Sequence, residues 1–487
     1  MKKSLAFVLS LLSLVFLATT LSAQTGKPTI SVYAPSNVAS FPSGLTENNN
    51  FIIDYIRQRT GYDVQWSIQP KDNLADKMNV LMASGTAPDV VVLGSKDLFA
   101  LYAQQGVLAP LDEPLKTVGA GVSKLIPAKT WKGVTFNKKI YAVPMPQNLE
   151  VQHGLLIRND WLKKLKLKTP TTVDELYTVL KAFKAAKLGG EKTIPFVGGI
   201  DPSAPNALMN TLMGAFGASV IWDEQNGKIV NTTVTPGYKD YLTTLNKWYA
   251  EGLLDSEFPV NKKANIIEKL VNGRAGVASL AWADARDTVL NAQKNDPNAE
   301  LIYIKPITGK NGLAGTAANP PIKTYLVVPA FSKKIKEAVD FISKYATDSS
   351  ILEYYSYGKD GVHYNKVGGV ITATPEQATI DWRVYYNIWD NQELFYYRKA
   401  ARGFSPVYDP LLPWRSTQVD DIAGFAPPIG AVESVRSTLF DLTTDFTVKT
   451  VLGATPLTDF DAYVTKWKAA GGEKAQKALQ DWYDSSK

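Results

Sequence analysis

Segments with strand character and segments with helix character alternate along the first hundred residues, and this order limits the possible folds more than any other feature. Three β-rich runs, "PTISVYAP" (28–35), "YDVQWSI" (62–68) and "PDVVVLG" (88–94), are separated by amphipathic segments that end at Gly61 and Gly85. The third run is continuously apolar, which is typical of a strand buried on both faces of a parallel sheet. The alternation predicts an α/β fold in which helices cover a parallel sheet.

A second α/β region follows across the middle of the chain. "KKIYAVPMPQ" (138–147) has strand character but holds two prolines, and Thr172 and Glu175 have the spacing of a helix capping box. "IKTYLVVPA" (322–330) predicts a further strand. The sequence shows no tandem repeat and no low-complexity linker. We therefore expect the two regions to share one compact body.

The first residues have the layout of a secretory signal peptide. Lys2 and Lys3 precede an apolar run over 5–17, and small residues follow up to Ala23. A transmembrane anchor is the alternative, but the apolar run is short for a span, which needs about 20 residues. We therefore expect a signal peptide over 1–23, cleaved near Ala23.

The chain contains no cysteine. An exported chain without cysteine forms no disulfides, so its core alone must stabilise it, and it lacks the residue at which bacterial lipoproteins are lipidated. We therefore expect a soluble periplasmic protein. Removing Lys2 and Lys3 lowers the formal net charge from +7 to +5, and this weakly basic balance fits an anionic ligand. The sequence holds no long Lys/Arg run of the kind that binds nucleic acid.

Sequence motifs of the common catalytic classes are missing. There is no G-x-S-x-G elbow, no H-E-x-x-H pair and no G-x-x-x-x-G-K-[ST] loop, which argues against an α/β-hydrolase, a zinc peptidase and a P-loop nucleotidase. His153 and His363 are the two histidines, and neither has an obvious nucleophile beside it. We therefore expect no catalysis. A secreted glycosidase or lyase stays open as the alternative, because paired carboxylates leave no short signature.

Aromatic and polar residues follow two of the expected strands. Tyr33 ends the first strand with Asn37 just beyond it, and Trp282 ends "GVASLAW" before Asp284 and Arg286. In open α/β sheets ligands bind beyond the carboxyl ends of the strands, and a sugar ring offers C–H faces to aromatic rings and hydroxyls to polar side chains. The pattern indicates a carbohydrate site, although each aromatic residue fits a core position equally well.

Five segments together resemble a known family. They are "KMNVLMASGTAPDVVVL" (77–93) with its A-S-G-x-x-P-D turn, "KIYAVPMP" (139–146), "LLIRNDWLKKLKLKTPTTVDELYTVLKAFK" (155–184) with R-x-D-W-L, "YGKDGVHY" (357–364) and "FDAYVTKWKAAGG" (460–472). In this order they resemble bacterial extracellular solute-binding proteins of family 1, the capture subunits of ABC sugar importers. Lys166 replaces a usual glycine in the third segment. The most similar branch includes receptors for aldouronate and alginate oligosaccharides.

The resemblance implies a two-lobe periplasmic-binding-protein fold of type II, with the ligand cleft between the lobes. Three hinge crossings would lie near Tyr141–Gln147, Lys323–Val328 and Gly358–Tyr364. The expected lobes are residues 27–146 plus 325–362 for the N-terminal lobe and residues 147–324 plus 363–487 for the C-terminal lobe.

The same resemblance, taken with the strand-end residues, implies a set of ligand-binding candidates. They are Tyr33, Asn37, Gln147, His153, Trp282, Asp284, Arg286, Tyr325, His363, Tyr364 and Trp414. Trp282 is expected to stack on a sugar ring. His363 is expected near the cleft floor, in hinge packing or ligand contact rather than as a general base.

One segment departs from the family pattern. Alginate-type receptors carry a calcium loop before an I-P-F strand, whereas "KLGGEKTIPF" (187–196) has Glu191 as its one acidic residue. A single carboxylate supplies too few oxygens for Ca²⁺, which takes six to eight. We predict neither a bound metal nor a cofactor, and the departure weakens a transfer of alginate specificity.

The implied function is capture of an oligosaccharide by closure of the two lobes. The oligosaccharide could contain uronic acids. The loaded protein would deliver its ligand to the membrane subunits of an ABC importer, and we expect it to act as a monomer without nucleic-acid partners. A carbohydrate-active enzyme is the first alternative. A receptor for a peptide or a polyamine is the second, and the basic balance disfavours a polyamine.

Overall fold

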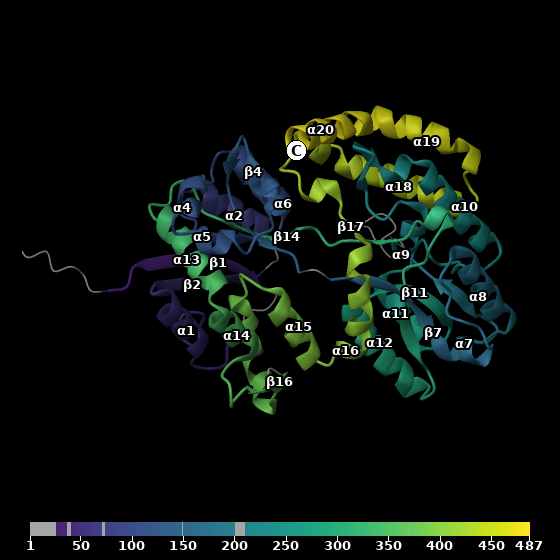
Figure 1. The fold of residues 1–487 in the computed structure, drawn as a ribbon, viewed down its shortest axis with the longest axis horizontal. Coiled ribbons are helices and arrows are strands. Elements are labelled where there is room, and N and C mark those ends of the chain that lie inside the picture. Colours follow the sequence, from purple (N-terminus) through teal and green to yellow (C-terminus); the bar gives the residue numbers. More distant parts are fainter. Residues whose placement is uncertain (1–25, 37–39, 71–73, 149, 200–209, 369) are drawn as a thin grey trace, which may run out of the picture.

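The computed structural model describes residues 26–36, 40–70, 74–148, 150–199, 210–368 and 370–487. The expected signal peptide at 1–23 and Asn37 lie outside the described residues. The described chain forms two halves, each built around one mixed β-sheet with helices on both faces (Figure 1). Within these ranges, no helix is both long and apolar enough to cross a membrane.

The sheet of the first half has the strand order β2-β1-β3-β14-β6. Its strands are β1 (Thr29–Ser36), β2 (Asp63–Pro70), β3 (Val90–Leu93), β6 (Val143–Pro146) and β14 (Ile322–Val327). Strand β1 runs parallel to β2 and β3, as the sequence predicts. Strand β14 runs antiparallel to β3 and β6, so the sheet is mixed.

Alternate residues of β1 face opposite sides of this sheet. Ile30 and Val32 are fully buried in one core, and Tyr33 is buried in the other. Both faces are therefore covered, as expected for strands with few polar residues. The helices of this half are α1 (Phe51–Thr60), α2 (Leu74–Ala83), α3 (Lys96–Gln104), α4 (Asp112–Lys116), α5 (Ala120–Ser123), α6 (Ala128–Trp131), α13 (Ile335–Thr347) and α14 (Ser349–Tyr357). Two short strand pairs join them, β4 (Thr135–Phe136) with β5 (Lys139–Ile140) and β15 (Tyr364–Val367) with β16 (Val370–Ala373).

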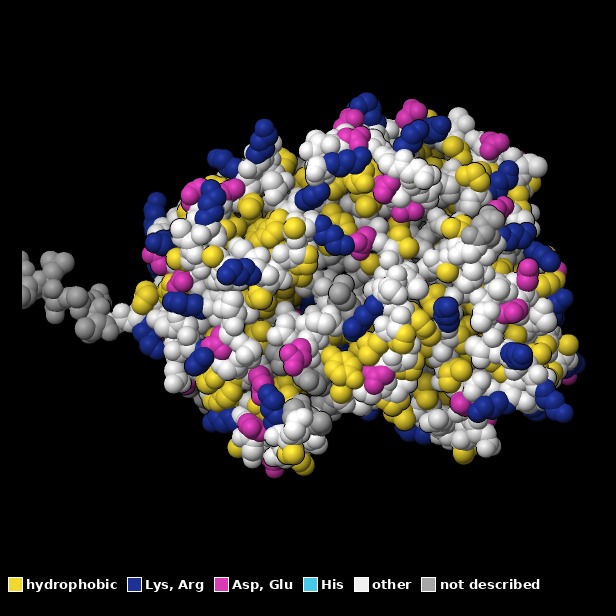
Figure 2. All heavy atoms as spheres, viewed as in Figure 1, with side chains coloured by type: hydrophobic (Ala, Val, Ile, Leu, Met, Phe, Trp, Pro, Cys, Tyr) yellow, Lys and Arg dark blue, Asp and Glu magenta, His cyan; other side chains and the backbone are white. Residues whose placement is uncertain are grey.

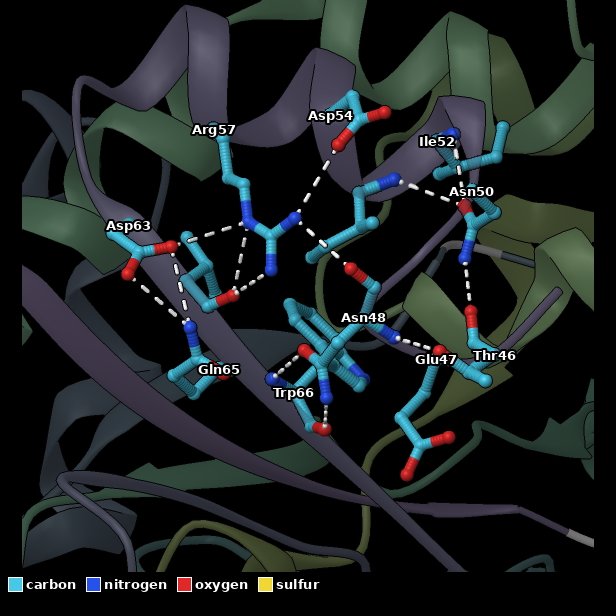
Figure 3. A network of polar contacts seen from close by, with 12 residues as sticks. Thr46, Glu47, Asn48, Asn50, Ile52, Asp54, Arg57, Asp63, Gln65 and Trp66 are labelled. Carbon is cyan, nitrogen blue, oxygen red and sulfur yellow. Dashed lines mark hydrogen bonds and ion pairs between the residues drawn. The ribbon is translucent and has the colours of Figure 1, made fainter.

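A polar network joins the start of α1 to β2 (Figure 3). The Asn50 side chain caps α1, because its Oδ1 accepts the Ile52 N–H at 2.9 Å. The Arg57 guanidinium reaches from α1 and donates through Nη2 to the Val64 carbonyl at 2.9 Å and through Nη1 to the Asn48 carbonyl at 3.0 Å. These bonds fix the angle at which α1 lies against the sheet edge.

The sheet of the second half has the order β12-β7-β11-β8. Its strands are β7 (His153–Arg158), β8 (Ile194–Val197), β11 (Ala275–Ala281) and β12 (Leu301–Ile304). The surrounding helices are α7 (Asn159–Lys164), α8 (Val173–Ala185), α9 (Asn210–Met213), α10 (Pro236–Ala250), α11 (Lys263–Val271), α12 (Trp282–Asn295), α16 (Ser405–Tyr408), α17 (Gly430–Glu433), α18 (Arg436–Val451), α19 (Phe460–Trp467) and α20 (Glu473–Ser485). Two short strand pairs accompany them, β9 (Trp222–Gln225) with β10 (Lys228–Asn231) and β13 (Thr316–Ala317) with β17 (Gln418–Val419). Helix α15 (Gln392–Ala401) contacts α14 and β16 of the first half and α16 of the second.

Residues 364–389 pack in the first half, which differs from the expected boundary at residue 362. Tyr364, Tyr386 and Trp389 are buried in the same core as Ile30. The Tyr386 hydroxyl also accepts a hydrogen bond from Asn50 Nδ2 at 2.6 Å. Burying these rings removes a large apolar area from water, so the segment adheres to the first half before the chain leaves it.

The chain passes between the two sheets three times. It leaves the first sheet after Pro146 and enters β7 at His153, and it returns between Ala317 and Ile322. It leaves the first core again after Trp389 and enters a core of the second half at Phe395. The first two passages lie next to the expected crossings. The third lies about thirty residues beyond the expected one, because Gly358–Tyr364 belongs to the first half.

Helix α3 of the first half also contacts the second half. Lys96 Nζ donates to the Ala423 carbonyl at 2.7 Å and lies 3.8 Å from the Glu433 carboxylate. Arg436 forms an ion pair with Asp97 at 2.6 Å. Burial lowers the pKa of Lys96, against the opposing pull of Glu433. The halves are thus joined by ionic contacts as well as by the three crossings.

Candidate functional site

The three crossings meet at one buried carboxylate. Asp390, in the third crossing, has a fully buried side chain that forms ion pairs with Arg398 and, at 3.5 Å, with Lys323 near the second crossing. Asn148 in the first crossing donates to the same carboxylate at 3.4 Å. A buried charge persists only when it is paired and hydrogen-bonded. We call this place, where residues of all three crossings touch Asp390, the junction.

Glu150 lies beside the junction, in the first crossing. It is 7% exposed. Its Oε2 accepts the Trp282 Nε1–H at 3.1 Å, and its Oε1 accepts Asn319 Nδ2 at 3.2 Å from the second crossing. Gln418 Nε2 donates to the Glu150 backbone carbonyl at 2.6 Å. Burial raises the pKa of the Glu150 carboxyl, although Lys399 opposes the shift.

Trp282 lies in an aromatic cluster, at the carboxyl end of β11. The ring centroids of Phe395, Phe404 and Tyr408 lie 5.1 to 6.2 Å from the Trp282 centroid, and each of the three ring planes is close to perpendicular to the Trp282 plane. The Lys399 ammonium lies over the Trp282 ring, 3.9 Å from its centroid. Helix α15, which carries Lys399, lies between the two halves (Figure 1). The cluster therefore combines flat apolar rings with a cation, the combination that suits an acidic sugar.

Several cations lie around this cluster. Among the described residues, Lys399, Arg402 and Arg415 form no ion pair, whereas Arg398 and Lys323 share Asp390. Burial lowers the pKa of Lys399 to about 8, with Arg398 and Arg402 adding to the shift and Glu150 opposing it. Figure 2 shows a hollow between the two halves, with Lys and Arg side chains beside it. The electrostatic field at this place favours an anion.

Several buried polar atoms near the crossings have no hydrogen-bond partner within the described part of the chain. They are Gln147 Oε1, Thr316 Oγ1 and Thr324 Oγ1. Each such atom costs free energy unless something pairs with it.

The structure brings some of the expected site residues together. Trp282 and Arg286 both contact Phe404, with the Arg286 guanidinium 5.6 Å from the ring centroid. Trp414 packs half-buried against the same core. His153 begins β7 opposite Ala281, the residue before Trp282. Asp284 pairs with Lys263 at 3.0 Å on the outer side of α12.

Other expected site residues lie apart from this cluster. Tyr33 and Tyr325 are buried on one face of the first sheet, where Tyr325 stacks on Phe99 with 4.8 Å between centroids. The Tyr364 hydroxyl donates to Glu353 at 2.6 Å in the first half. Burial raises the pKa of Tyr33 to about 12. Tyr33, Tyr325 and Tyr364 thus lie in core positions. The sequence allowed a core position as an alternative to ligand contact for each aromatic residue.

His363 also lies in the first half. It is 8% exposed, and its ring stacks on Phe51 with 5.4 Å between centroids and 7° between planes. Its Nδ1 accepts the Lys359 N–H at 2.9 Å. Gly358 adopts φ +91°, and a Cβ there would lie 2.6 Å from His363 Nδ1, so only glycine fits beside the ring. His363 closes a turn in the first half and lies outside the crossings.

The residues that sequence reasoning missed are Glu150, Asp390, Arg398, Lys399 and Arg415. A signal for part of this set is visible in "WDNQELFYYRKAARGF" (389–404), where a run of three aromatic residues is followed directly by two basic residues. An isolated Glu in an otherwise apolar and amide-rich crossing, "MPQNLEVQ" (145–152), is the other signal.

The segment that departs from the calcium loop has a local structure of its own. Lys187 Nζ pairs with the Glu191 carboxylate at 2.7 Å, and Thr193 Oγ1 donates to the Gly190 carbonyl at 2.7 Å. Glu191 is thus engaged by a lysine of its own turn. No group of three or more acidic, histidine or cysteine side chains suited to a metal occurs in the described ranges. The absence of calcium stays a prediction.

Comparison with known proteins identifies the family. The model of the family "Bacterial extracellular solute-binding protein" matches residues 40–351. The chain is 26% identical to lipoprotein LipO of Bacillus subtilis (strain 168), covering 96% of this chain and 94% of LipO, and 28% identical to the polygalacturonan/rhamnogalacturonan-binding protein YtcQ of the same strain, covering 88% and 86%. A crystal structure of the alginate-binding protein AlgQ2 without calcium ion superposes with a TM-score of 0.65 at 18% identity, covering 94% of this chain and 98% of AlgQ2. This protein belongs to the family of bacterial extracellular solute-binding proteins, which bind their solutes for transport rather than convert them.

Proposed function

We propose that the protein captures an acidic oligosaccharide outside the cytoplasm and delivers it to an ABC importer. Membership of the solute-binding family supports the transport role. The observation that carries the choice of ligand is the aromatic cluster around Trp282, which holds Lys399, Arg402 and Arg415 without carboxylate partners among the described residues. The name of the relative YtcQ, a polygalacturonan/rhamnogalacturonan-binding protein, points to the same class of ligand.

The two halves would act as the lobes of a closing cleft. The first lobe would comprise residues 27–146 and 322–389, and the second residues 153–317 and 395–487, with the three crossings between them. A sugar held at the aromatic cluster would also meet the unpaired atoms of Gln147 and Thr324. The ligand would thus bridge both lobes, and its differential affinity for the closed form would shift the population toward that form.

We also propose how the protein is exported and which partner it meets. The chain would be cleaved near Ala23, act in the periplasm as a monomer and present its closed form to the membrane subunits of the importer. N-terminal sequencing of the mature protein tests the export step. A mature chain that begins at Met1 and stays in the membrane would refute it.

A thermal-shift panel tests the choice of ligand. The panel holds oligomers of galacturonic acid and mannuronic acid together with neutral oligomers of similar length. A ligand at 100 times its Kd adds about 2.7 kcal/mol to the free energy of unfolding, so an acidic oligomer should raise Tm by several degrees. Stabilisation by neutral oligomers alone would contradict the acidic ligand. Stabilisation by no oligosaccharide would contradict carbohydrate capture altogether.

A further inference from the structure

Lys399 has an unusual environment for a lysine. Its ammonium lies 3.9 Å from the centroid of Trp282 and 4.6 Å from that of Phe395, and it forms no ion pair with any described residue. Lysine is strongly hydrated and flexible, so it normally keeps its charge in water or beside a carboxylate. Here the charge rests on aromatic rings, which provide only part of the stabilisation that water would give.

The Glu150 carboxylate offsets only part of the cost of burying this charge, because the pKa of Lys399 stays lowered. Both oxygens of Glu150 already accept hydrogen bonds, one from Trp282 and one from Asn319. Asp390, the other buried acid of the junction, is shared by Arg398 and Lys323. Neither Glu150 nor Asp390 therefore forms an ion pair with Lys399.

The groups that face Lys399 come from four elements. Glu150 of the first crossing favours the charged form, while Arg398 of α15, Arg402 just after α15 and Lys323 of β14 disfavour it. Trp282 of α12 presents its ring. Burial adds to the three like charges and lowers the pKa of Lys399 to about 8. A ligand carboxylate would relieve this repulsion.

We propose that Lys399 is the residue that selects an acidic ligand: its ammonium rests on the Trp282 ring in the free protein and pairs with a ligand carboxylate as a sugar ring takes its place over that ring. This inference rests on the proposed function and assigns its specificity to one side chain. The exchange explains how Trp282, which is 5% exposed here, becomes available for stacking. Because of this exchange, the ligand carboxylate pairs with Lys399 at the same time as the sugar ring stacks on Trp282.

Binding of a charged and an uncharged version of one ligand tests the inference. The probes are a trimer of galacturonic acid and its fully methyl-esterified counterpart, which keeps rings and linkages but lacks the charge. The variant is Lys399→Met, which keeps most of the apolar side chain. The control is Lys449→Met, because Lys449 is exposed on α18 and pairs only with Asp445 at 2.8 Å. A charge-assisted hydrogen bond predicts a roughly 10- to 100-fold loss of affinity for the acidic trimer in Lys399→Met and no comparable loss for the ester.

The results that would overturn the inference differ in whether they also contradict the proposed ligand class. Equal affinity of wild type and Lys399→Met for the acidic trimer, or an equal loss for acid and ester, would remove Lys399 as the selecting residue while leaving carbohydrate capture intact. If the wild-type protein binds neither trimer, the same comparison is made with a trimer of mannuronic acid and its methyl ester, and binding of none of the four would contradict the proposed ligand class and the inference with it. Melting curves of all variants confirm that they are folded.

Proton uptake supplies an independent readout. At pH 8 a substantial fraction of Lys399 is neutral in the free protein, and pairing with a carboxylate raises its pKa. Titrations at pH 8 in two buffers of different ionisation enthalpy should therefore show uptake of roughly half a proton with the acidic trimer. The uptake should vanish in Lys399→Met. No uptake by the wild type, or the same uptake by the variant, would contradict the inference.

Discussion

Trp282 illustrates how one side chain serves both packing and binding. Its ring contributes to the buried core of the second half, and its Nε1–H satisfies the buried Glu150 carboxylate. A change to alanine would therefore mix two effects, since loss of a buried tryptophan costs about 3–5 kcal/mol of stability. A milder change separates them.

We predict that Trp282→Phe lowers affinity for an acidic oligosaccharide by about 1–2 kcal/mol, or roughly 10-fold, while the protein stays folded. Phenylalanine offers a smaller stacking face and leaves Glu150 without one donor. The measurement is a binding titration, with Trp482→Phe on α20 as the control because Trp482 packs against a different core. Unchanged affinity in Trp282→Phe would remove this ring from the site.

His363 is expected to affect stability and not ligand binding. His363→Gln removes the stacking on Phe51 and disturbs the bond from the Lys359 N–H, so we predict a loss of about 1–3 kcal/mol in the free energy of unfolding. Affinity for the ligand should not change, and neither form should convert a bound oligosaccharide. New reducing ends or unsaturated products that depend on His363 would instead indicate an active site.

The stability of the first half should also depend on the protonation of His363. Burial lowers its pKa, with Lys359 and Arg383 adding to the shift. The unfolded chain therefore binds the proton more readily than the folded one, so stability falls as pH drops below about 6.5 toward the folded-state pKa. Urea midpoints at pH 7.5 and 5.5 should differ less in His363→Gln than in the wild type. An equal pH dependence in both would show that another group is responsible.

At the scale of elements, the crossings depend on Asp390. In Asp390→Asn the cations of Arg398 and Lys323 would lose their shared carboxylate at a buried position. Breaking a buried pair in this way typically costs about 3–5 kcal/mol. We predict a markedly lower urea midpoint for Asp390→Asn than for Asp381→Asn, since Asp381 is exposed and pairs only with Arg383 at 3.1 Å. Similar midpoints in the two variants would contradict a central role for Asp390.

Local elements were predictable from the sequence because their signals are local. The order of β1, β2 and β3 with their helices follows from periodicity and terminal glycines, and the Thr172 cap of α8 is present, with Thr172 Oγ1 accepting the Glu175 N–H at 3.2 Å. The antiparallel insertion of β14 was not predictable, because that strand arrives from more than two hundred residues away. The direction of β14 depends on a long-range strand pairing, which the residues near β14 in the sequence do not predict.

The candidate site was predictable only in part for the same reason. Trp282 was identified because strand ends are visible in a sequence. The junction was not, since Asn148 of the first crossing, Lys323 at the start of β14 and Asp390 of the third crossing meet only in the folded chain. The sequence places residues 375–389 in the C-terminal lobe with the rest of 363–487, whereas their rings are buried in the first half, because burial depends on α1 and α14, which lie far away in the sequence.

At the scale of the whole molecule, the family of this chain binds carbohydrates for transport without chemical change. Membership of the solute-binding family supports capture, and the acidic ligand that we propose rests on the aromatic cluster around Trp282 and its neighbouring cations. Lys96 and Arg436 also join the two halves by a hydrogen bond and an ion pair outside the crossings.

Isothermal titration of the purified protein with a trimer of galacturonic acid tests this claim most directly, because one trace distinguishes binding from turnover. The account predicts discrete heats that saturate at one trimer per chain and return to the baseline after each injection. Heat that continues after each injection, from conversion of the trimer, would contradict it. The absence of saturable heat with this trimer and with every other acidic oligosaccharide would contradict it as well.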